Sequence, residues 1–373
     1  MIPFNKPYLT GKETEYIEDA VRSGKISGNG KYTQLCQSFF EEKLGVKKSL
    51  LTTSCTDALE MAAILINIQA GDEVIMPSYT FVSTSNAFVL RGANIIFADS
   101  YANNPNIDAE KIEALITAKT KAIVPVHYAG IACDMDKIME LSNKYNLYVI
   151  EDAAQAIDSY YTGKKKKKKA LGSIGHLAAF SFHETKNIIS GEGGMLAIND
   201  EQFINRAEII WEKGTNRSAF FRGEVDKYGW VDIGSSFLPS EIIAAFLWAQ
   251  LENLEDIQKI RKQHWEAYYR QLLNWAAMNE IELPIVPNYA TNNAHMFFIK
   301  CKSIEQRTNL INGLKEKNIH PVFHYISLHN SPFYKDKHDG RELVQSDNFT
   351  NKLLRLPLFY ELDVQEVINQ ILK

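Results

Sequence analysis

The chain has 373 residues, of which 45% are hydrophobic and 23% are charged, and its formal net charge is −4. This composition is typical of a folded globular protein, and the slightly negative charge excludes a global positive field that would attract nucleic acid or anionic lipid. The four cysteines lack zinc-ligand spacing, and no apolar run is long enough to span a bilayer. We therefore expect a soluble cytoplasmic protein with no nucleic-acid or membrane partner.

Short apolar runs alternate with amphipathic segments in the first 200 residues. Strands are predicted at 49–54, 73–78, 94–99, 121–127, 147–153, 177–183 and 194–200. Helices are predicted at 56–68, 83–92, 108–118 and 134–145. Such alternation is typical of a parallel sheet with helices on both faces.

The pattern changes after residue 240. Apolar residues at helical spacing predict one long helix over 240–278, followed by a strand at 295–301, a helix at 307–318 and a strand at 320–326. The chain is also longer than one core usually holds. We therefore predict a large domain over 1–245 and a small α+β domain over 246–373.

Polar residues follow three of the predicted strands, and ligands of open parallel sheets bind at the carboxyl ends of strands. The first set is Ser54 and Thr56 in "TTSCTDAL", where the free N–H groups of a helix start favour a phosphate. An ordinary helix cap is the alternative. The segment matches neither the Walker pattern nor the dinucleotide pattern, so it does not indicate a nucleoside triphosphate or NAD site.

The second set is Asp152 and Gln155 in "LYVIEDAAQ". A carboxylate at the end of an apolar strand is costly unless it has a partner, and strand alternation sends Glu151 and Asp152 to opposite sides. A cationic ring nitrogen of a cofactor would explain Asp152. A plain helix cap would explain it equally well.

The third set is Ser181, His183 and Lys186 in "FSFHETKN". Burial lowers the pKa of a lysine amine, which can then form a Schiff base, although a lone lysine is more often a solvated charge. An anion cradle, an acid and an amine together match the phosphate, ring nitrogen and aldehyde of pyridoxal 5′-phosphate. The three sets therefore predict this cofactor.

Several longer segments resemble the DegT/DnrJ/EryC1/StrS family of sugar aminotransferases, and the resemblance extends over essentially the whole chain. They are "LLTTSCTDALEMAA", "GDEVIMPSYTFVSTSNAFVLRGA", "VPVHYAG", "VIEDAAQA", "FSFHETKN" and "GEGG". The resemblance implies the aspartate aminotransferase-like α/β fold (fold type I), with a mostly parallel seven-stranded sheet in the large domain and a smaller C-terminal α+β domain. Three further segments, "KGTNRSAFFRGEVDKY", "FHYISLH" and "LLRLPLFY", resemble the dTDP-4-amino-4,6-dideoxygalactose transaminase branch of enterobacterial common antigen synthesis.

The resemblance also implies roles for individual residues. Lys186 would be the Schiff-base lysine, and Asp152 the partner of the pyridinium nitrogen. Gln155 would bond the ring hydroxyl, and Phe81, whose alternative is a simple core residue, would stack on the ring. The phosphate would be held by Thr56, the backbone at Asp57, Ser181 and, from a neighbouring subunit, Ser236, which stands where many members have asparagine. A homodimer with shared active sites is therefore expected.

Cationic and hydrogen-bonding side chains in two later segments suit a pyrophosphate and a sugar. The substrate-binding candidates are His183, Lys213, Asn216, Arg217, His324, Tyr325 and His329. A zinc site at His324 and His329 would lack a third ligand nearby, so no metal is expected.

The resemblance implies transfer of an amino group from glutamate to a dTDP-4-keto-6-deoxyhexose, giving a dTDP-4-amino-4,6-dideoxyhexose of galactose configuration. A C3-specific keto-sugar aminotransferase and a non-catalytic binding or regulatory protein are the alternatives. The residues alone do not show whether the amino group is added at C3 or at C4 of the sugar. They also do not show whether the new amine is axial or equatorial. The row of six lysines, Lys164–Lys169, is predicted to be a solvated surface loop.

Overall fold

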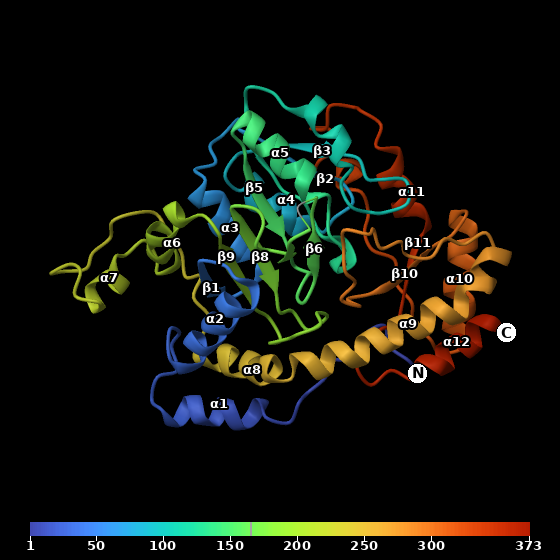
Figure 1. Ribbon diagram of the computed structural model, residues 1–373, viewed down its shortest axis with the longest axis horizontal. Helices are drawn as coiled ribbons and strands as arrows, with labels where there is room; N and C mark the ends of the chain where they lie inside the picture. The colour runs from blue at the N-terminus through green and yellow to red at the C-terminus, as the bar shows by residue number, and fades with distance from the viewer. Residues whose placement is uncertain (165) are drawn as a thin grey trace.

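A seven-stranded sheet forms the centre of the computed structural model, which describes residues 1–164 and 166–373 (Figure 1). The strand order is β1–β9–β8–β5–β4–β2–β3. Strand β9 is antiparallel to both neighbours, and the other adjacent pairs are parallel. The strands are β1 (Lys48–Thr52), β2 (Glu73–Pro77), β3 (Asn94–Ala98), β4 (Thr120–Ile123), β5 (Tyr148–Asp152), β8 (Leu177–Ser181) and β9 (Gly194–Ile198). The predicted mostly parallel α/β fold is confirmed.

Both faces of the sheet are buried. Successive residues of a strand point to opposite faces, so the apolar strands of this sheet place apolar side chains on both. Leu51 and Ile75 belong to one apolar cluster, whereas Leu50 and Val74 belong to the other. The first cluster includes side chains of α2 (Lys31–Leu44), α5 (Met135–Tyr145) and α8 (Glu241–Glu252), and α1 (Glu13–Arg22) packs on α8. The second includes side chains of α3 (Cys55–Leu65), α4 (Val82–Val89) and α6 (Ile204–Trp211). Helices on both faces therefore provide the cover that a parallel sheet requires.

The C-terminal third has its own small sheet and its own apolar cluster. The predicted helix over 240–278 is interrupted at Asn253, and its second part, α9 (Leu254–Met278), extends along the molecule to this region (Figure 1). There β10 (Phe297–Lys300) pairs antiparallel with β11 (Leu353–Leu356), beside α10 (Ile304–Glu316), α11 (Val344–Lys352) and α12 (Val364–Leu372). A third apolar cluster joins α9 to this sheet. The separate cluster supports a small domain, but its boundary near residue 245 stays a prediction.

Two predicted elements are absent from the described structure. Residues 320–326 are not a strand: only Val322 forms a bridge, to Arg355, because the next residues turn into the cavity described below. Residues 108–118 form two short 3₁₀ turns, η1 (Ala109–Lys111) and η2 (Glu113–Leu115), rather than a helix. Ile112, which lies between the two turns, is buried in the core.

The lysine-rich segment forms a hairpin in which β6 (Tyr160–Thr162) pairs antiparallel with β7 (Lys168–Ala170). Lys164 and 166–169 are exposed, as predicted, whereas Lys165 lies outside the described residues. The prediction of a loop is wrong at the end of the run, where two lysines join β7. The Lys168 ammonium lies 4.0 Å from the centre of the Tyr160 ring, which gives this end of the hairpin an intramolecular contact.

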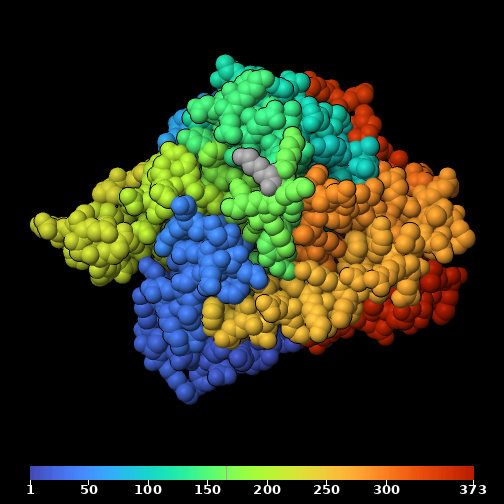
Figure 2. Space-filling model, viewed as in Figure 1, coloured from blue at the N-terminus to red at the C-terminus, as the bar shows by residue number. Residues whose placement is uncertain are grey.

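An arm, defined as residues 212–236 around α7 (Arg217–Phe221), projects from the body of the molecule. It is the yellow segment at the left of Figures 1 and 2. Its apolar side chains are open to solvent, with Phe221 68% exposed and Trp230 83% exposed. In the part of the chain that the structure describes, no helix is both long and apolar enough to traverse a membrane.

Candidate active site

A cavity of about 420 Å³ opens at the carboxyl ends of the sheet strands. Its wall includes residues at or just beyond the ends of five strands: Ser54, Thr80, Val126, Asp152 and Ser181. The C-terminal region closes the cavity with His324, Tyr325 and Arg355, and Phe4 comes from the N-terminal segment. Nine of the predicted site residues line it: Thr56, Phe81, Asp152, Gln155, Ser181, His183, Lys186, His324 and Tyr325.

The start of α3 forms one wall of the cavity. Ser54 caps this helix, since its hydroxyl accepts a hydrogen bond from the backbone N–H of Asp57 at 3.1 Å. Among the described residues, the backbone N–H groups of Cys55 and Thr56 have no acceptor, and both residues line the cavity. Two free N–H groups at the positive end of a helix are suited to bind an anion, and Ser181 lines the same cavity.

Gly194 allows β9 to approach this helix start closely. A Cβ atom at residue 194 would lie 2.3 Å from the carbonyl carbon of Ser54 and 2.4 Å from the backbone nitrogen of Cys55. Both neighbours are backbone atoms, so a larger residue would displace the helix start from the sheet. The last glycine of "GEGG" thus allows β9 to pack directly against the start of α3.

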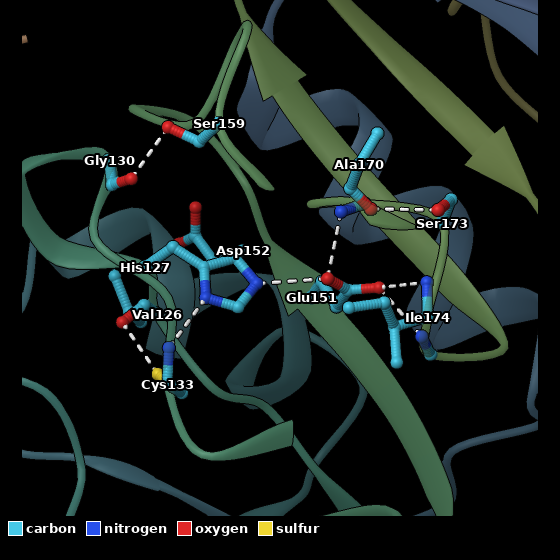
Figure 3. Close-up of polar contacts among 12 residues, drawn as sticks. Val126, His127, Gly130, Cys133, Glu151, Asp152, Ser159, Ala170, Ser173 and Ile174 are labelled. Carbon is cyan, nitrogen blue, oxygen red and sulfur yellow. Dashed lines mark hydrogen bonds and ion pairs between the residues drawn. The ribbon is translucent and has the colours of Figure 1, made fainter. Parts of the chain in front are cut away.

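Asp152 and Glu151 leave the end of β5 in opposite directions, as the strand alternation predicts (Figure 3). The carboxylate of Asp152 accepts hydrogen bonds from the Thr84 hydroxyl at 2.7 Å and from the backbone N–H of Ala154 at 3.2 Å. Burial raises its pKa, although these bonds and the charge of Lys186 act in the other direction. A buried acid of this kind is stabilised as a carboxylate when a cation binds beside it.

Glu151 is instead enclosed in a saturated network behind the strand (Figure 3). Its carboxylate accepts bonds from the backbone N–H groups of Gly172, Ile174 and Gly175 at 2.8, 2.7 and 2.6 Å. The fourth partner is His127, whose Nε2 lies 2.9 Å away. Because the Nδ1 atom of His127 accepts from the backbone of Cys133, the ring proton is on Nε2 and points at Glu151. The hydrogen-bonding capacity of this carboxylate is therefore satisfied by groups of the protein itself.

Lys186 lies in the cavity wall after β8, with its side chain half-buried. Burial lowers the pKa of its amine, and the charge of Arg355 lowers it further, whereas Cys55 and Asp152 act in the other direction. A lysine with a lowered pKa has a larger neutral fraction, and the neutral amine is the nucleophile and base. The environment therefore suits chemistry at this amine.

Gln155 and Phe81 line the same cavity as Asp152 and Lys186. The Gln155 amide donates to the Tyr325 hydroxyl at 3.2 Å, while its carbonyl accepts from the backbone N–H of Ala129 at 2.6 Å. Phe81 is 54% exposed although it follows a buried strand, and its ring centre lies 5.9 Å from that of Tyr325. An exposed aromatic ring in a cavity wall offers a face on which a flat ligand can stack.

The sequence model of the DegT/DnrJ/EryC1/StrS aminotransferase family matches residues 7–372. The chain belongs to this family. It is 32% identical over 385 residues to the spore coat polysaccharide biosynthesis protein SpsC of Bacillus subtilis (strain 168), an alignment that covers 99% of this chain and 96% of that protein. It is 33% identical over 373 residues to GDP-perosamine synthase of Escherichia coli O157:H7, with 98% and 96% covered.

The fold comparison agrees with the family. A candidate sugar aminotransferase, Spr1654 of Streptococcus pneumoniae, superimposes in its PLP form with a TM-score of 0.88 at 25% identity, covering 99% of this chain and 97% of the other. The PMP form of the same protein gives a TM-score of 0.89. The predictions of an aminotransferase and of pyridoxal phosphate as its cofactor are confirmed. The narrower branch, with its dTDP sugar, stays a prediction.

The cavity of this family member has the chemistry that pyridoxal phosphate requires. The free N–H groups at the start of α3 match the phosphate, and the exposed ring of Phe81 matches the flat pyridine. Asp152 is a buried acid whose carboxylate gains from a cationic nitrogen, and Lys186 is an amine with a lowered pKa. The cofactor therefore fits the residues that are present. The role of each individual residue stays a prediction.

Six predicted site residues lie outside the cavity. The N–H of Asp57 is used by the Ser54 cap, and its carboxylate lies 3.0 Å from the same hydroxyl. His329 is buried, with Nδ1 2.7 Å from the Ser78 hydroxyl and Nε2 3.5 Å from Asp347, so its position indicates a packing role. The other four are on the arm: Lys213, Asn216, Arg217 and Ser236. No group of three or more metal-ligating side chains occurs within residues 1–164 and 166–373.

Several polar residues of the cavity wall were not predicted from the sequence, among them Thr84, His295 and Arg355. Thr84 binds Asp152 from within α4. His295 is 4% exposed, lines the cavity and has Nδ1 2.8 Å from the Asn187 amide oxygen. Arg355 lies in β11, and its signal was visible in "LLRLPLFY" as one charged residue within an apolar strand.

Proposed function

We propose that this family member transfers the amino group of glutamate to C4 of a dTDP-4-keto-6-deoxyhexose. The product is a dTDP-4-amino-4,6-dideoxyhexose of galactose configuration. The proposal depends on one observation above all: the amine of Lys186 and the carboxylate of Asp152 line the same cavity at the strand ends. The choice of sugar is supported by the three segments that resemble the dTDP-4-amino-4,6-dideoxygalactose branch.

The names of the relatives are compatible with a nucleotide-linked sugar as the acceptor. One relative is named as a synthase of a GDP-linked sugar, and another as a polysaccharide biosynthesis protein. We propose that the acceptor of this enzyme is of the same chemical kind, with dTDP as the nucleotide.

When bound, the cofactor would supply a ring that accepts the electron pair released when a proton leaves the α-carbon of the donor. Asp152 holds a proton on the ring nitrogen, because a buried carboxylate strongly favours an adjacent cation. Thr84 and the backbone of Ala154 fix the direction of this carboxylate. The Nζ atom of Lys186 would carry the proton from the α-carbon of the donor to the cofactor and, in the second half-reaction, from the cofactor to C4 of the sugar; its lowered pKa favours this role.

We also propose that two copies of the chain form a homodimer with shared active sites. The arm projects from the body and exposes the apolar side chains of Phe221 and Trp230 (Figure 2). Exposed large apolar groups on a projecting segment favour burial against another protein surface. In a dimer, Ser236, Lys213, Asn216 and Arg217 on the arm would be available to the cavity of the partner rather than to their own.

The test is an assay with purified enzyme, pyridoxal phosphate, glutamate and dTDP-4-keto-6-deoxyglucose. We expect 2-oxoglutarate and an aminosugar nucleotide, with the nitrogen on C4 in axial orientation by proton coupling constants. An amine on C3 or an equatorial amine would contradict the proposed regiochemistry or configuration. Reaction of the enzyme with glutamate but with no dTDP-keto sugar would contradict the proposed acceptor.

A further inference from the structure

Asn187, the residue that follows Lys186, is held by a cluster of buried polar side chains. Its Nδ2 atom donates hydrogen bonds to Oε1 of Gln258 at 2.7 Å and to the backbone carbonyl of Asn293 at 2.9 Å. Its Oδ1 atom lies 2.8 Å from Nδ1 of His295. All four of these polar residues are buried. The chain is therefore fixed at the position directly after the residue that carries the amine.

These contacts determine the tautomer of His295. The backbone carbonyl of Asn293 can only accept, so it fixes the amide nitrogen of Asn187 on its own side and leaves the amide oxygen facing the histidine. Because that oxygen cannot donate, Nδ1 of His295 carries the proton. Burial lowers the pKa of this histidine, and the charges of Lys186 and of two arginines lower it further, so the ring is uncharged near neutral pH. His295 thus donates to Asn187 and also lines the cavity.

The segment 293–295, which carries this histidine, is itself held by two other parts of the molecule. Two side chains of α9, Gln258 and Arg261, donate to all three of its carbonyls, at 3.2, 3.1 and 2.8 Å. The side chain of Asn293 donates at 2.8 Å to the carbonyl of Gln155, in the loop after β5. Because the backbone of the segment is fixed, its histidine can hold another loop in place.

We propose that His295 is a positioning residue for Lys186 and acts through its hydrogen bond to Asn187. This bond connects the loop after β8 to the fixed segment 293–295, and so it holds the backbone from which the amine extends. A reacting group has to be kept within about 0.5 Å of its productive position, and the groups behind it have to hold it there. The inference rests on the proposed role of Lys186 and adds what keeps that residue in place.

The position of the cluster favours this role over a contribution to stability alone. His295 lines the same cavity as Lys186, and its bond reaches the residue next to that lysine. Apolar side chains could fill a buried space without the desolvation cost of four polar groups. Hydrogen bonds are directional, however, and a fully bonded polar cluster specifies one position of the loop.

The test follows the attachment of pyridoxal phosphate to the full-length apoenzyme, without donor or sugar. The rise of the visible cofactor band after rapid mixing gives the rate of attachment to Lys186. We expect His295→Leu to slow attachment about 10- to 100-fold, because a misplaced amine reaches the cofactor aldehyde less often. His295→Asn should stay within about 3-fold of wild type, since its side-chain amide can donate from nearly the position of Nδ1.

A second ligand separates the position of the amine from general damage to the cavity. Pyridoxamine phosphate has an amine in place of the aldehyde, so it forms no bond with Lys186. Its Kd, measured by calorimetry, should stay within about 3-fold of wild type in both His295 variants.

Asn187→Ala tests the same contact from the other side, and it keeps the inference testable if His295→Leu does not fold. It should slow attachment at least as much as His295→Leu does. The double variant should be no slower than Asn187→Ala alone, because the hydrogen bond that His295→Leu removes is already absent.

His176 provides a matched control. Its Nδ1 atom accepts a hydrogen bond from the backbone N–H of Val149 at 2.9 Å, and burial lowers its pKa as it does for His295, but it does not line the cavity. His176→Leu removes a comparable histidine bond and should leave the rate of attachment unchanged.

An unchanged rate of attachment in both His295→Leu and Asn187→Ala overturns the inference. Equal losses in His295→Leu and His295→Asn also overturn it, since another part of the ring would then act directly. So do additive losses in the double variant, an equal loss of affinity for pyridoxamine phosphate, and an equal loss in His176→Leu. The proposed role of Lys186 fails separately, if Lys186→Ala apoenzyme forms the band at the wild-type rate. Because neither donor nor sugar is present, the result does not depend on the proposed substrates.

Discussion

Adjacent residues of β5 carry carboxylates into two very different environments. Glu151 accepts three backbone N–H bonds and one from His127, and every partner belongs to the protein. Asp152 has two donors and lines a cavity that also contains Lys186. Both acids are buried, but only Asp152 lines the cavity.

The pKa shifts of the two acids differ in the same way. Burial alone would raise the pKa of both. For Glu151 the bonds from His127, Gly175 and Gly172 outweigh burial, and its pKa is lowered; for Asp152 burial dominates, and its pKa is raised. A saturated buried acid stabilises the fold, whereas an unsaturated buried acid is ready to stabilise a ligand cation.

The largest effect is expected on the cavity side, from Lys186→Ala. Loss of the amine removes both the nucleophile and the proton carrier, so turnover should fall by more than about 10⁴-fold. The yellow absorption band of the cofactor-bound enzyme should also be lost. Turnover is measured with saturating glutamate and keto sugar, and absorbance on the purified variant.

Lys213→Ala provides a control for Lys186→Ala, because that lysine is exposed on the arm, outside the cavity of its own chain. Because the proposed role of Lys213 is to bind the sugar nucleotide in the partner's cavity, Lys213→Ala should leave the absorption band of the cofactor intact. A Lys186→Ala protein that kept both the band and turnover would remove the assignment of this residue.

The next effect is expected from Asp152→Asn, which keeps the shape of the side chain and removes its charge. Proton-transfer steps should slow by about 10²- to 10³-fold, because a neutral amide does not hold a proton on the ring nitrogen. The free energy of unfolding of the apoenzyme should stay the same or rise, since an uncompensated buried charge has been removed. A solvent-exchange measurement of the donor α-proton checks the rate, and near-normal exchange would contradict the role.

The opposite pattern is expected from Glu151→Gln. The new amide places an NH₂ group against backbone N–H donors, so the free energy of unfolding should fall by about 3 kcal/mol, measured by urea titration. Activity per folded molecule should change little, because Glu151 does not line the cavity and points away from Asp152 (Figure 3). A Glu151→Gln variant with normal stability but lost turnover would contradict the structural role of Glu151 and indicate a role in the reaction.

The pH dependence of this loss follows from the lowered pKa of Glu151 in the folded protein. A depressed carboxyl pKa contributes stability that is complete above the ordinary value of 4.5 and is lost as pH falls through the folded pKa. The difference between wild type and Glu151→Gln should therefore narrow below about pH 4.5. A difference that stayed constant down to that range and beyond would indicate a purely steric effect.

The same comparison explains what the sequence could predict. Lys186, Asp152 and Gln155 follow apolar strands directly, and the ends of parallel strands meet at one edge, so local pattern was enough to bring them together. Thr84 reaches the cavity from helix α4. Arg355 reaches it from strand β11, some 200 residues after Asp152 in the chain. Only the folded structure shows that these residues meet there. His329 shows the reverse case: its sequence context suggested a substrate contact, whereas its side chain is bonded to Ser78 and does not line this cavity.

The secondary-structure predictions had the same limit. Strands β2, β3 and β5 were predictable because each is a short apolar run of its own. Residues 320–326 have the same apolar character, but His324 and Tyr325 are directed to the cavity, and the backbone leaves the strand conformation. Local pattern thus predicted the scaffold better than the segments that close the site.

The smallest effect is expected from the exposed lysines of the β6–β7 hairpin, although they are the most conspicuous feature of the sequence. They have neither the saturated network of Glu151 nor the cavity of Asp152, and like charges held close together repel. Replacing Lys164 and Lys166–Lys169 with serine should change the free energy of unfolding by no more than about 0.5 kcal/mol per site. Donor and acceptor kinetics at low and high salt should match those of wild type. A salt-dependent rise in the KM for the sugar nucleotide would instead indicate that the hairpin lysines bind the diphosphate of the substrate. Functional residues would then extend beyond the cavity.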